Sequence, residues 1–222
     1  MNDTLQALLL QAERLEAVQA CRNLMGKYSY LHTAFRNKEY VELWAKRDDS
    51  RLTMPFGVFE GYEAIYRCYI EIHGDRSIPA DAEEIKGLMM IHEMNTEVLE
   101  VAADGKTAKG IWITPGTETA PSPGKEKGSW CWGKYEVDFI QEDGQWKFWK
   151  MRLWPIYKTD FYVPWTEHPD MDEVDFPFHN HTALPEPNWA WDPDVFYPEH
   201  EPEPPKPYEH YEDVEPALWA KY

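Results

Sequence analysis

Apolar residues recur three or four positions apart over the first part of the chain, as they do along one face of a helix. The residues in this pattern are Leu5, Leu8, Leu9, Ala12, Leu15, Val18 and Leu24. The spacing predicts a first helix over residues 5–35. Similar patterns predict shorter helices over residues 37–45 and 62–74.

Strand-type patterns dominate after the third predicted helix. Residues 88–102, 107–118, 128–141 and 145–157 are expected to be long strands, and residues 51–61 form an earlier strand-like segment. Polar Asp-Gly turns at 102–107 and 141–145 are typical of antiparallel hairpins. Helices followed by a run of antiparallel strands predict an α+β fold.

The composition changes abruptly near residue 165. Residues 166–222 hold 15 acidic against 2 basic residues and 11 of the 18 prolines, which is incompatible with a long helix or a central strand. The segment nevertheless keeps aromatic residues, among them Trp191, Tyr208 and Tyr211. We therefore expect a domain over 1–165 and an extended arm over 166–222, whose aromatic rings dock on the core or on a neighbouring subunit.

The net charge of −18 narrows the possible partners. Phosphate backbones and anionic lipids repel such a polyanion, so we expect neither nucleic acid nor a membrane as a partner. No apolar run approaches the ~18 residues of a membrane span, and the first residues lack the pattern of a secretory signal. The three scattered cysteines, Cys21, Cys68 and Cys131, favour a cytoplasmic protein without disulfides.

Nucleotide-binding, serine-hydrolase and HExxH metal motifs do not occur in the sequence. Among eight histidines, only His92 lies well inside a predicted strand, where a buried structural histidine is the ordinary interpretation. His179 and His181 could offer two metal ligands, but their proline-rich surroundings make this a weak signal. We expect no metal and no cofactor.

Four segments follow one another along the chain: LEAVQACRNLMGKYSYLHTAFRNKEYVELWA, FEGYEAIYRCY, IHEMNTEVLEVAADGKTAKGIWI and GKYEVDFIQEDGQWKFWKMRL. In this order and spacing they resemble the SnoaL-like branch of the NTF2-like superfamily, which includes scytalone dehydratase, ketosteroid isomerase and bile-acid 7α-dehydratase. The resemblance covers roughly residues 10–160 and implies an NTF2-like cone, with N-terminal helices packed on a curved antiparallel sheet.

Two short sequence motifs contain residues with an implied function. Residues 26–28 (GKY) resemble the place of a catalytic tyrosine in the bile-acid dehydratase, and residues 92–96 (HEMNT) resemble the segment that holds the family's catalytic histidine. The resemblance thus implies His92 and Tyr28 as catalytic residues. The dehydratase's acidic residue would fall near residues 114–116, which hold no carboxylate, and Glu118 is the nearest. Bile acids are therefore not implied as the substrate.

The implied activity is that of a cofactor-free lyase, in which a neutral histidine accepts a proton and a tyrosine donates one. An aromatic or polycyclic substrate is expected because tryptophans lie near the implied site. Some members of the family act on lignin-derived diaryl-propanediols and release formaldehyde, and the resemblance makes such a substrate one possibility for this chain. The expected substrate-binding residues are His32, Trp112, Trp132, Lys134 and Arg152.

Strand alternation groups the candidate residues without showing which face is inward. Residues 112, 114 and 116 share one face of their strand, and residues 130, 132, 134, 136 and 138 share one face of theirs. Two other functions remain open for this fold: a non-catalytic ligand-binding or assembly module, and the structural small subunit of a ring-hydroxylating dioxygenase. The resemblance implies a homo-oligomer, with a trimer favoured over a dimer.

Overall fold

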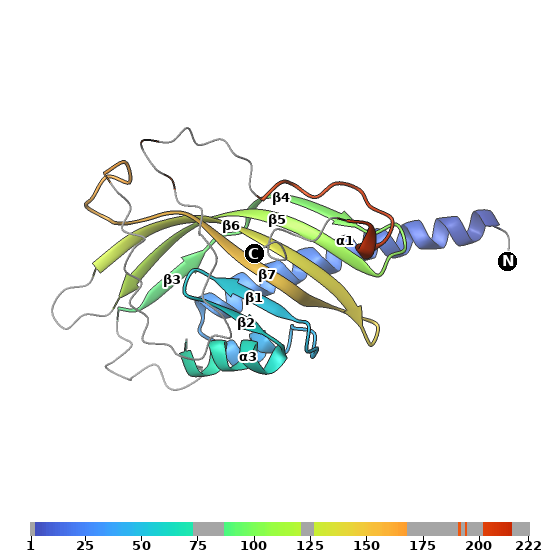
Figure 1. The fold of residues 1–222 in the computed structure, drawn as a ribbon, viewed down its shortest axis with the longest axis horizontal. Coiled ribbons are helices and arrows are strands. Elements are labelled where there is room, and N and C mark those ends of the chain that lie inside the picture. Colours follow the sequence, from blue (N-terminus) through green and yellow to red (C-terminus); the bar gives the residue numbers. More distant parts are fainter. Residues whose placement is uncertain are drawn as a thin grey trace.

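The computed structural model describes residues 3–72, 87–120, 127–167, 191, 194 and 202–214 (Figure 1). Its helices are α1 (Asp3–Thr33), α2 (Asn37–Val41) and α3 (Tyr62–Arg67), which continues into the π-helical turn η1 (Cys68–Ile72). A short 3₁₀ turn, η3 (Tyr211–Asp213), lies near the C-terminus. None of these described helices is both long enough and apolar enough to cross a membrane.

Seven strands form one sheet. They are β1 (Arg51–Met54), β2 (Gly57–Glu60), β3 (Met89–His92), β4 (Asn95–Val101), β5 (Thr107–Ala120), β6 (Lys127–Glu142) and β7 (Gln145–Asp160). Their order is β2-β1-β7-β6-β5-β3, and β4 also pairs with β5. All pairs are antiparallel except β1 with β7, so the expected α+β fold is confirmed with one parallel pair added.

The hairpin turns have the expected chemistry. Asp143 and Gly144 join β6 to β7 with φ values of 50° and 73°, the pair of positive φ angles that a two-residue type I′ turn requires. Helix α2 ends at Val41 rather than at the expected Ala45. The chain leaves the helix because Ala45 donates its backbone N–H to the carbonyl of Phe148, which ties this segment to β7.

The sheet is curved, and the helices lie on its concave side (Figure 1). Register shifts between β6 and β7, after Trp132 and after Asp138, mark bulges of the kind that bend a strand and increase its twist. The core fills the space between helices and sheet. Its fully buried large side chains include Tyr28, Tyr40, Trp44, Tyr135 and Phe148.

Only the C-terminal part of α1 packs against this core. Its buried residues are Ala17, Cys21, Leu24, Met25, Tyr28 and His32. The first turns project beyond the sheet, with the N-terminus far from the body (Figure 1). Four leucines of the apolar pattern that predicts this helix are exposed: Leu5, Leu8, Leu9 and Leu15.

The outer face of the sheet also buries charged groups. Asp138 accepts hydrogen bonds from Lys109 Nζ at 3.0 Å and from the Tyr211 hydroxyl at 2.6 Å, and Lys150 Nζ donates to the same hydroxyl at 3.0 Å. Tyr208 bonds to Thr107 through its hydroxyl and to the β4–β5 turn through its carbonyl. Residues 202–214 of the arm thus dock on the body. Contact of the arm with a neighbouring subunit stays a prediction.

Replacing Tyr211 by Phe should lower the free energy of unfolding by about 1–3 kcal/mol, because Asp138 is buried and loses a hydrogen bond to its charged carboxylate. Denaturant titration followed by fluorescence measures this change. Tyr162→Phe is the matched control, since Tyr162 is 89% exposed. Equal stability of Tyr211→Phe and wild type would show that the hydrogen bond from Tyr211 to Asp138 does not stabilise the fold.

Candidate active site

A cavity of about 230 Å³ lies on the concave side of the sheet. It is bounded by the end of α1, the β1–β2 turn, β3, and the neighbouring parts of β5, β6 and β7. Its apolar wall includes Met54, Pro55, Phe56, Met90, Leu153 and Pro155. Its polar groups belong to His32, His92, Thr114, Glu118, Cys131, Tyr135 and Lys158.

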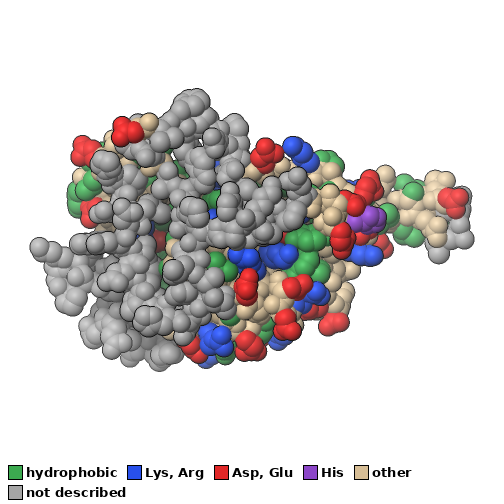
Figure 2. Space-filling view, viewed as in Figure 1, with side chains coloured by type: hydrophobic (Ala, Val, Ile, Leu, Met, Phe, Trp, Pro, Cys, Tyr) green, Lys and Arg blue, Asp and Glu red, His purple; other side chains and the backbone are tan. Residues whose placement is uncertain are grey.

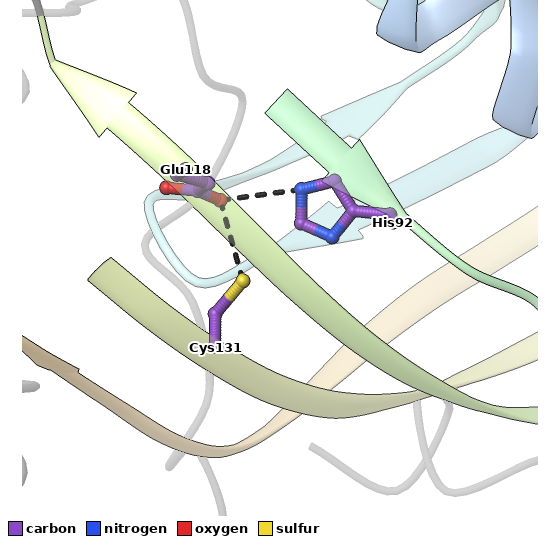
Figure 3. A group of neighbouring side chains, drawn as sticks. All are labelled: His92, Glu118 and Cys131. Carbon is purple, nitrogen blue, oxygen red and sulfur yellow. Dashed lines mark hydrogen bonds and ion pairs between the residues drawn. The ribbon is translucent and has the colours of Figure 1, made fainter. Parts of the chain in front are cut away.

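Strand pairing brings His92 and Glu118 together. His92, the last residue of β3, pairs with Gly116 of β5, and Glu118 lies two residues further along β5 on the same face. The His92 Nε2 and Glu118 Oε1 atoms are 3.2 Å apart (Figure 3). The other carboxylate oxygen of Glu118 bonds to the ammonium of Lys158 on β7. The carboxylate is therefore shared between a histidine and a lysine.

These partners keep Glu118 ionised. Burial by itself would raise the pKa of its carboxyl group, but the hydrogen bond to His92 and the positive charge of Lys158 outweigh burial and lower the pKa to about 2. An ionised carboxylate can only accept hydrogen bonds. His92 must then carry a proton on Nε2, so Nδ1 is the ring atom that can accept a proton.

Gly116 makes room for this pair. A Cβ atom at Gly116 would lie 2.7 Å from Cys131 Sγ, 2.7 Å from the carbonyl oxygen of Ile91 and 3.1 Å from His92 Nδ1. The first two distances are shorter than real Cβ contacts allow. Glycine at this position therefore permits β3 and the Cys131 side chain to approach β5 closely.

A pair of tyrosine hydroxyls lies beside the cavity. Tyr135 of β6 lines the cavity, and its hydroxyl is 2.6 Å from that of Tyr28 on α1. Burial raises the pKa of both phenols, so both remain protonated near neutral pH. Tyr28 stacks on His32 with a centroid distance of 5.3 Å, and the His32 ring is 6.3 Å from that of His92.

The structure places the sequence-predicted residues in three groups. His92, His32 and Trp132 are among the residues that line the cavity. Tyr28 is not among the described lining residues, because it lies behind Tyr135.

The third group lies outside the cavity. Trp112 is packed in the core, where its indole N–H donates to Glu97. Lys134 and Arg152 pair with Trp154 and Glu136 across β6 and β7, on the outer face of the sheet. Arg152 is 1% exposed and stacks on the Trp154 ring at 3.6 Å. We therefore do not retain Trp112, Lys134 or Arg152 as substrate-binding residues.

Sequence reasoning missed Tyr135 and Lys158 and left Glu118 in doubt. The available signal was alternation: residues 114, 116 and 118 share a face of β5, and residue 135 shares a face with the buried Val137 and Phe139. The lysine gave no such signal, because its approach to Glu118 depends on how β7 pairs with β6.

One group of described residues has the donor atoms of a metal site: His92, Glu118 and Cys131, whose ligand atoms lie within 4.8 Å of one another (Figure 3). The chemistry of these donors fits a cation poorly. Lys158 already neutralises Glu118, and burial raises the pKa of the Cys131 thiol to about 12, so it is protonated rather than a thiolate. The weak histidine pair at residues 179 and 181 lies outside the described residues.

Fold and cavity together define a helix-covered, curved-sheet domain with acid–base groups on its concave side. Residues 13–152 match the family model for the SnoaL-like domain, so the chain belongs to this family and the expected NTF2-like resemblance is confirmed. None of the curated proteins matches the chain in sequence.

Solved structures share the fold at low sequence identity. A candidate scytalone dehydratase from Novosphingobium aromaticivorans DSM 12444 is 17% identical, with a TM-score of 0.54 over 69% of this chain and 93% of that one. A type 2 hexachlorocyclohexane dehydrochlorinase is 17% identical, with a TM-score of 0.56 over 72% of this chain and 99% of that one. The type 3 dehydrochlorinase from Novosphingobium barchaimii LL02 is 19% identical, with a TM-score of 0.54 over 69% of this chain and 99% of that one.

Glu118→Gln should reduce the loss of unfolding free energy that the protein shows as the pH falls below 4.5. The folded-state pKa of Glu118, about 2, lies below its ordinary value of 4.5, so the unfolded chain binds more protons between these two values. The stabilisation from the carboxylate is thus present above pH 4.5 and is lost as the pH falls towards 2. Urea titrations at several pH values measure the slope, and an identical slope in wild type and variant would contradict the ionised state of Glu118.

Gly116→Ala should disturb the cavity, since an added methyl group meets backbone and Cys131 atoms at 2.7 Å. We expect a loss of about 1–3 kcal/mol in unfolding free energy, the usual cost of overpacking. Gly26→Ala is the control, because nothing lies within 4 Å of a Cβ at this helical position. The control should be neutral or stabilising. If Gly116→Ala left the unfolding free energy unchanged, β3 and the Cys131 side chain would have to lie further from residue 116 than the distances of 2.7 Å given above.

Proposed function

We propose that this chain is a cofactor-independent lyase that acts on an aromatic small molecule by acid–base chemistry in the cavity. The observation that carries the proposal is His92 held against an ionised Glu118, with Tyr135 among the residues that line the same apolar-walled cavity. The names of the dehydratase and dehydrochlorinases that share the fold denote loss of water and of hydrogen chloride, which supports an elimination.

His92 is the proposed general base. Glu118 fixes the ring and stabilises the imidazolium that forms when Nδ1 accepts a proton from carbon or oxygen of the substrate. Lys158 keeps the carboxylate charged throughout this step. Glu118 and Lys158 therefore act through His92, as positioning residues.

The tyrosine pair is the proposed acid. Tyr135 donates a proton to the departing hydroxyl oxygen, and Tyr28, which the family resemblance implies as catalytic, supports it through the hydroxyl contact of 2.6 Å. Water leaves, and the electrons of the broken C–H or C–C bond form a carbon–carbon double bond. His92 takes up one proton and Tyr135 delivers one, so the net charge of the protein does not change, and transfer of a proton from His92 to Tyr135 restores both side chains.

The cavity volume limits the substrate. An apolar cavity of about 150 Å³ can hold benzene, so 230 Å³ accommodates one substituted aromatic ring better than a fused polycycle. Two lyase reactions suit such a compound. A dehydration would remove a C–H proton and a hydroxyl group, and a deformylation of an aryl-propanediol would release formaldehyde from its hydroxymethyl group together with water.

The alternative is a non-catalytic module, including a structural role like that of a dioxygenase small subunit. A filled cone would favour that role. The open cavity, with His92 and Tyr135 on its wall, favours the enzyme.

His92→Ala should lower turnover by at least about 10²-fold, because the general base is lost. The assay offers a panel of aryl-propanediols and follows the ultraviolet absorbance of the conjugated alkene, with a separate assay for formaldehyde that distinguishes deformylation from dehydration. His210→Ala is the control, since this exposed ring bonds to Asp104 outside the cavity. Alkene formation at the wild-type rate by His92→Ala would refute the mechanism.

A further inference from the structure

The projecting turns of α1 carry an apolar stripe on the side away from the body. Leu5, Leu8, Ala12 and Leu15 follow one another at intervals of three, four and three residues, and all four are exposed, with Leu8 at 57% and Leu15 at 71%. At 3.6 residues per turn they occupy roughly a quarter of the helix circumference. Hydrophobic side chains are visible on this projecting segment in Figure 2.

The stripe is separate from the face that α1 buries in the domain. Ala17, Leu24 and Tyr28 point to the opposite side of the helix, and Leu10 shares that side, where its Cδ1 atom lies 3.5 Å from the Cβ position of Gly105. Helical turns of this length are marginally stable in water without a packing partner. The alternating spacing of three and four is that of a coiled-coil seam, which requires a second helix with a matching stripe.

We propose that the first turns of α1 pair, antiparallel, with the same turns of a second copy of this chain. In this register Leu5 packs against Leu15 of the partner and Leu8 against the small Ala12, so the stripe is complementary to itself. Such a two-fold interface repeats the same contacts on both copies. The pairing does not depend on the proposed function.

Charge favours a second copy and this direction. The segment from residue 3 to 16 carries only Asp3, Glu13, Arg14 and Glu16, whereas the whole chain carries −18. Antiparallel helices place the two acidic bodies at opposite ends, which limits their mutual repulsion. A helix that lies on a membrane surface is typically rich in lysine and arginine on its polar face, and this one has a single arginine.

Light scattering of the full-length chain tests the pairing. The double variant Leu8→Glu/Leu15→Glu should have half the molar mass of wild type, whether the larger unit is a dimer or a pair of trimers. The control Gln6→Glu adds charge to an exposed position outside the stripe and should keep the wild-type mass. Circular dichroism checks that each variant is folded. An unchanged mass for the folded double variant would overturn the proposal.

Disulfide formation tests the direction. Leu5→Cys/Leu15→Cys should give a reducible covalent dimer on mild oxidation, and these positions are about 15 Å apart along one helix, too far for a bond within one chain. Leu5→Cys alone should give no dimer, because its partner position holds leucine. Dimer formation by the single variant would show parallel pairing, and absence of dimer from both would rule out the interface.

Discussion

The ionised carboxylate of Glu118 organises the concave side of the sheet. A buried carboxylate without partners would take up a proton, since desolvation disfavours its charge. The ammonium of Lys158 and the ring N–H of His92 reverse this preference, and the resulting charge then determines the histidine tautomer. Three strands supply these groups, so the protonation state of the proposed base depends on the pairing of β3, β5, β6 and β7 as a unit. Losing the lysine would weaken the ionised state of Glu118 and, with it, the orientation of His92.

Strand alternation separates this group from a second set of buried charges. On the outer face, burial and the nearby charge of Asp138 raise the pKa of Glu136 to about 7, although Trp154 donates a hydrogen bond to it and Lys109 and Arg152 are close. Because this folded-state pKa lies above the ordinary 4.5, the folded protein retains a proton there that the unfolded chain has lost. That contribution lowers stability as the pH rises from 4.5 to 7, the reverse of the Glu118 contribution at acid pH. The two windows meet near pH 4.5, so the combined contribution of these two carboxylates to stability is largest there.

Local patterns predicted the elements well and the site only in part. Asp-Gly turns and helical spacing predicted the hairpins and the helices, and His92 was found because residues 92–96 resemble the segment that holds the family's catalytic histidine. The faces of β6 and β7 were not predictable, since a shift of one residue exchanges inner and outer side chains. Lys134 and Arg152 were therefore expected at the cavity, whereas Tyr135 lines it. The partnership of His92 with Glu118 requires the register of β3 on β5, which no local pattern contains.

Helix α1 combines two separate roles along its length. Near its C-terminal end, Tyr28 and His32 lie on the buried face, one helical turn apart, and reach the hydroxyl of Tyr135 and the cavity. Near its N-terminal end, the apolar stripe points the other way. From Leu5 to His32 the helix extends about 40 Å, so a partner bound to the stripe leaves the cavity and its proton-transfer groups untouched. The proposed association and the proposed chemistry thus use different faces and different ends of one helix, so a substitution in the stripe is expected to alter one without the other.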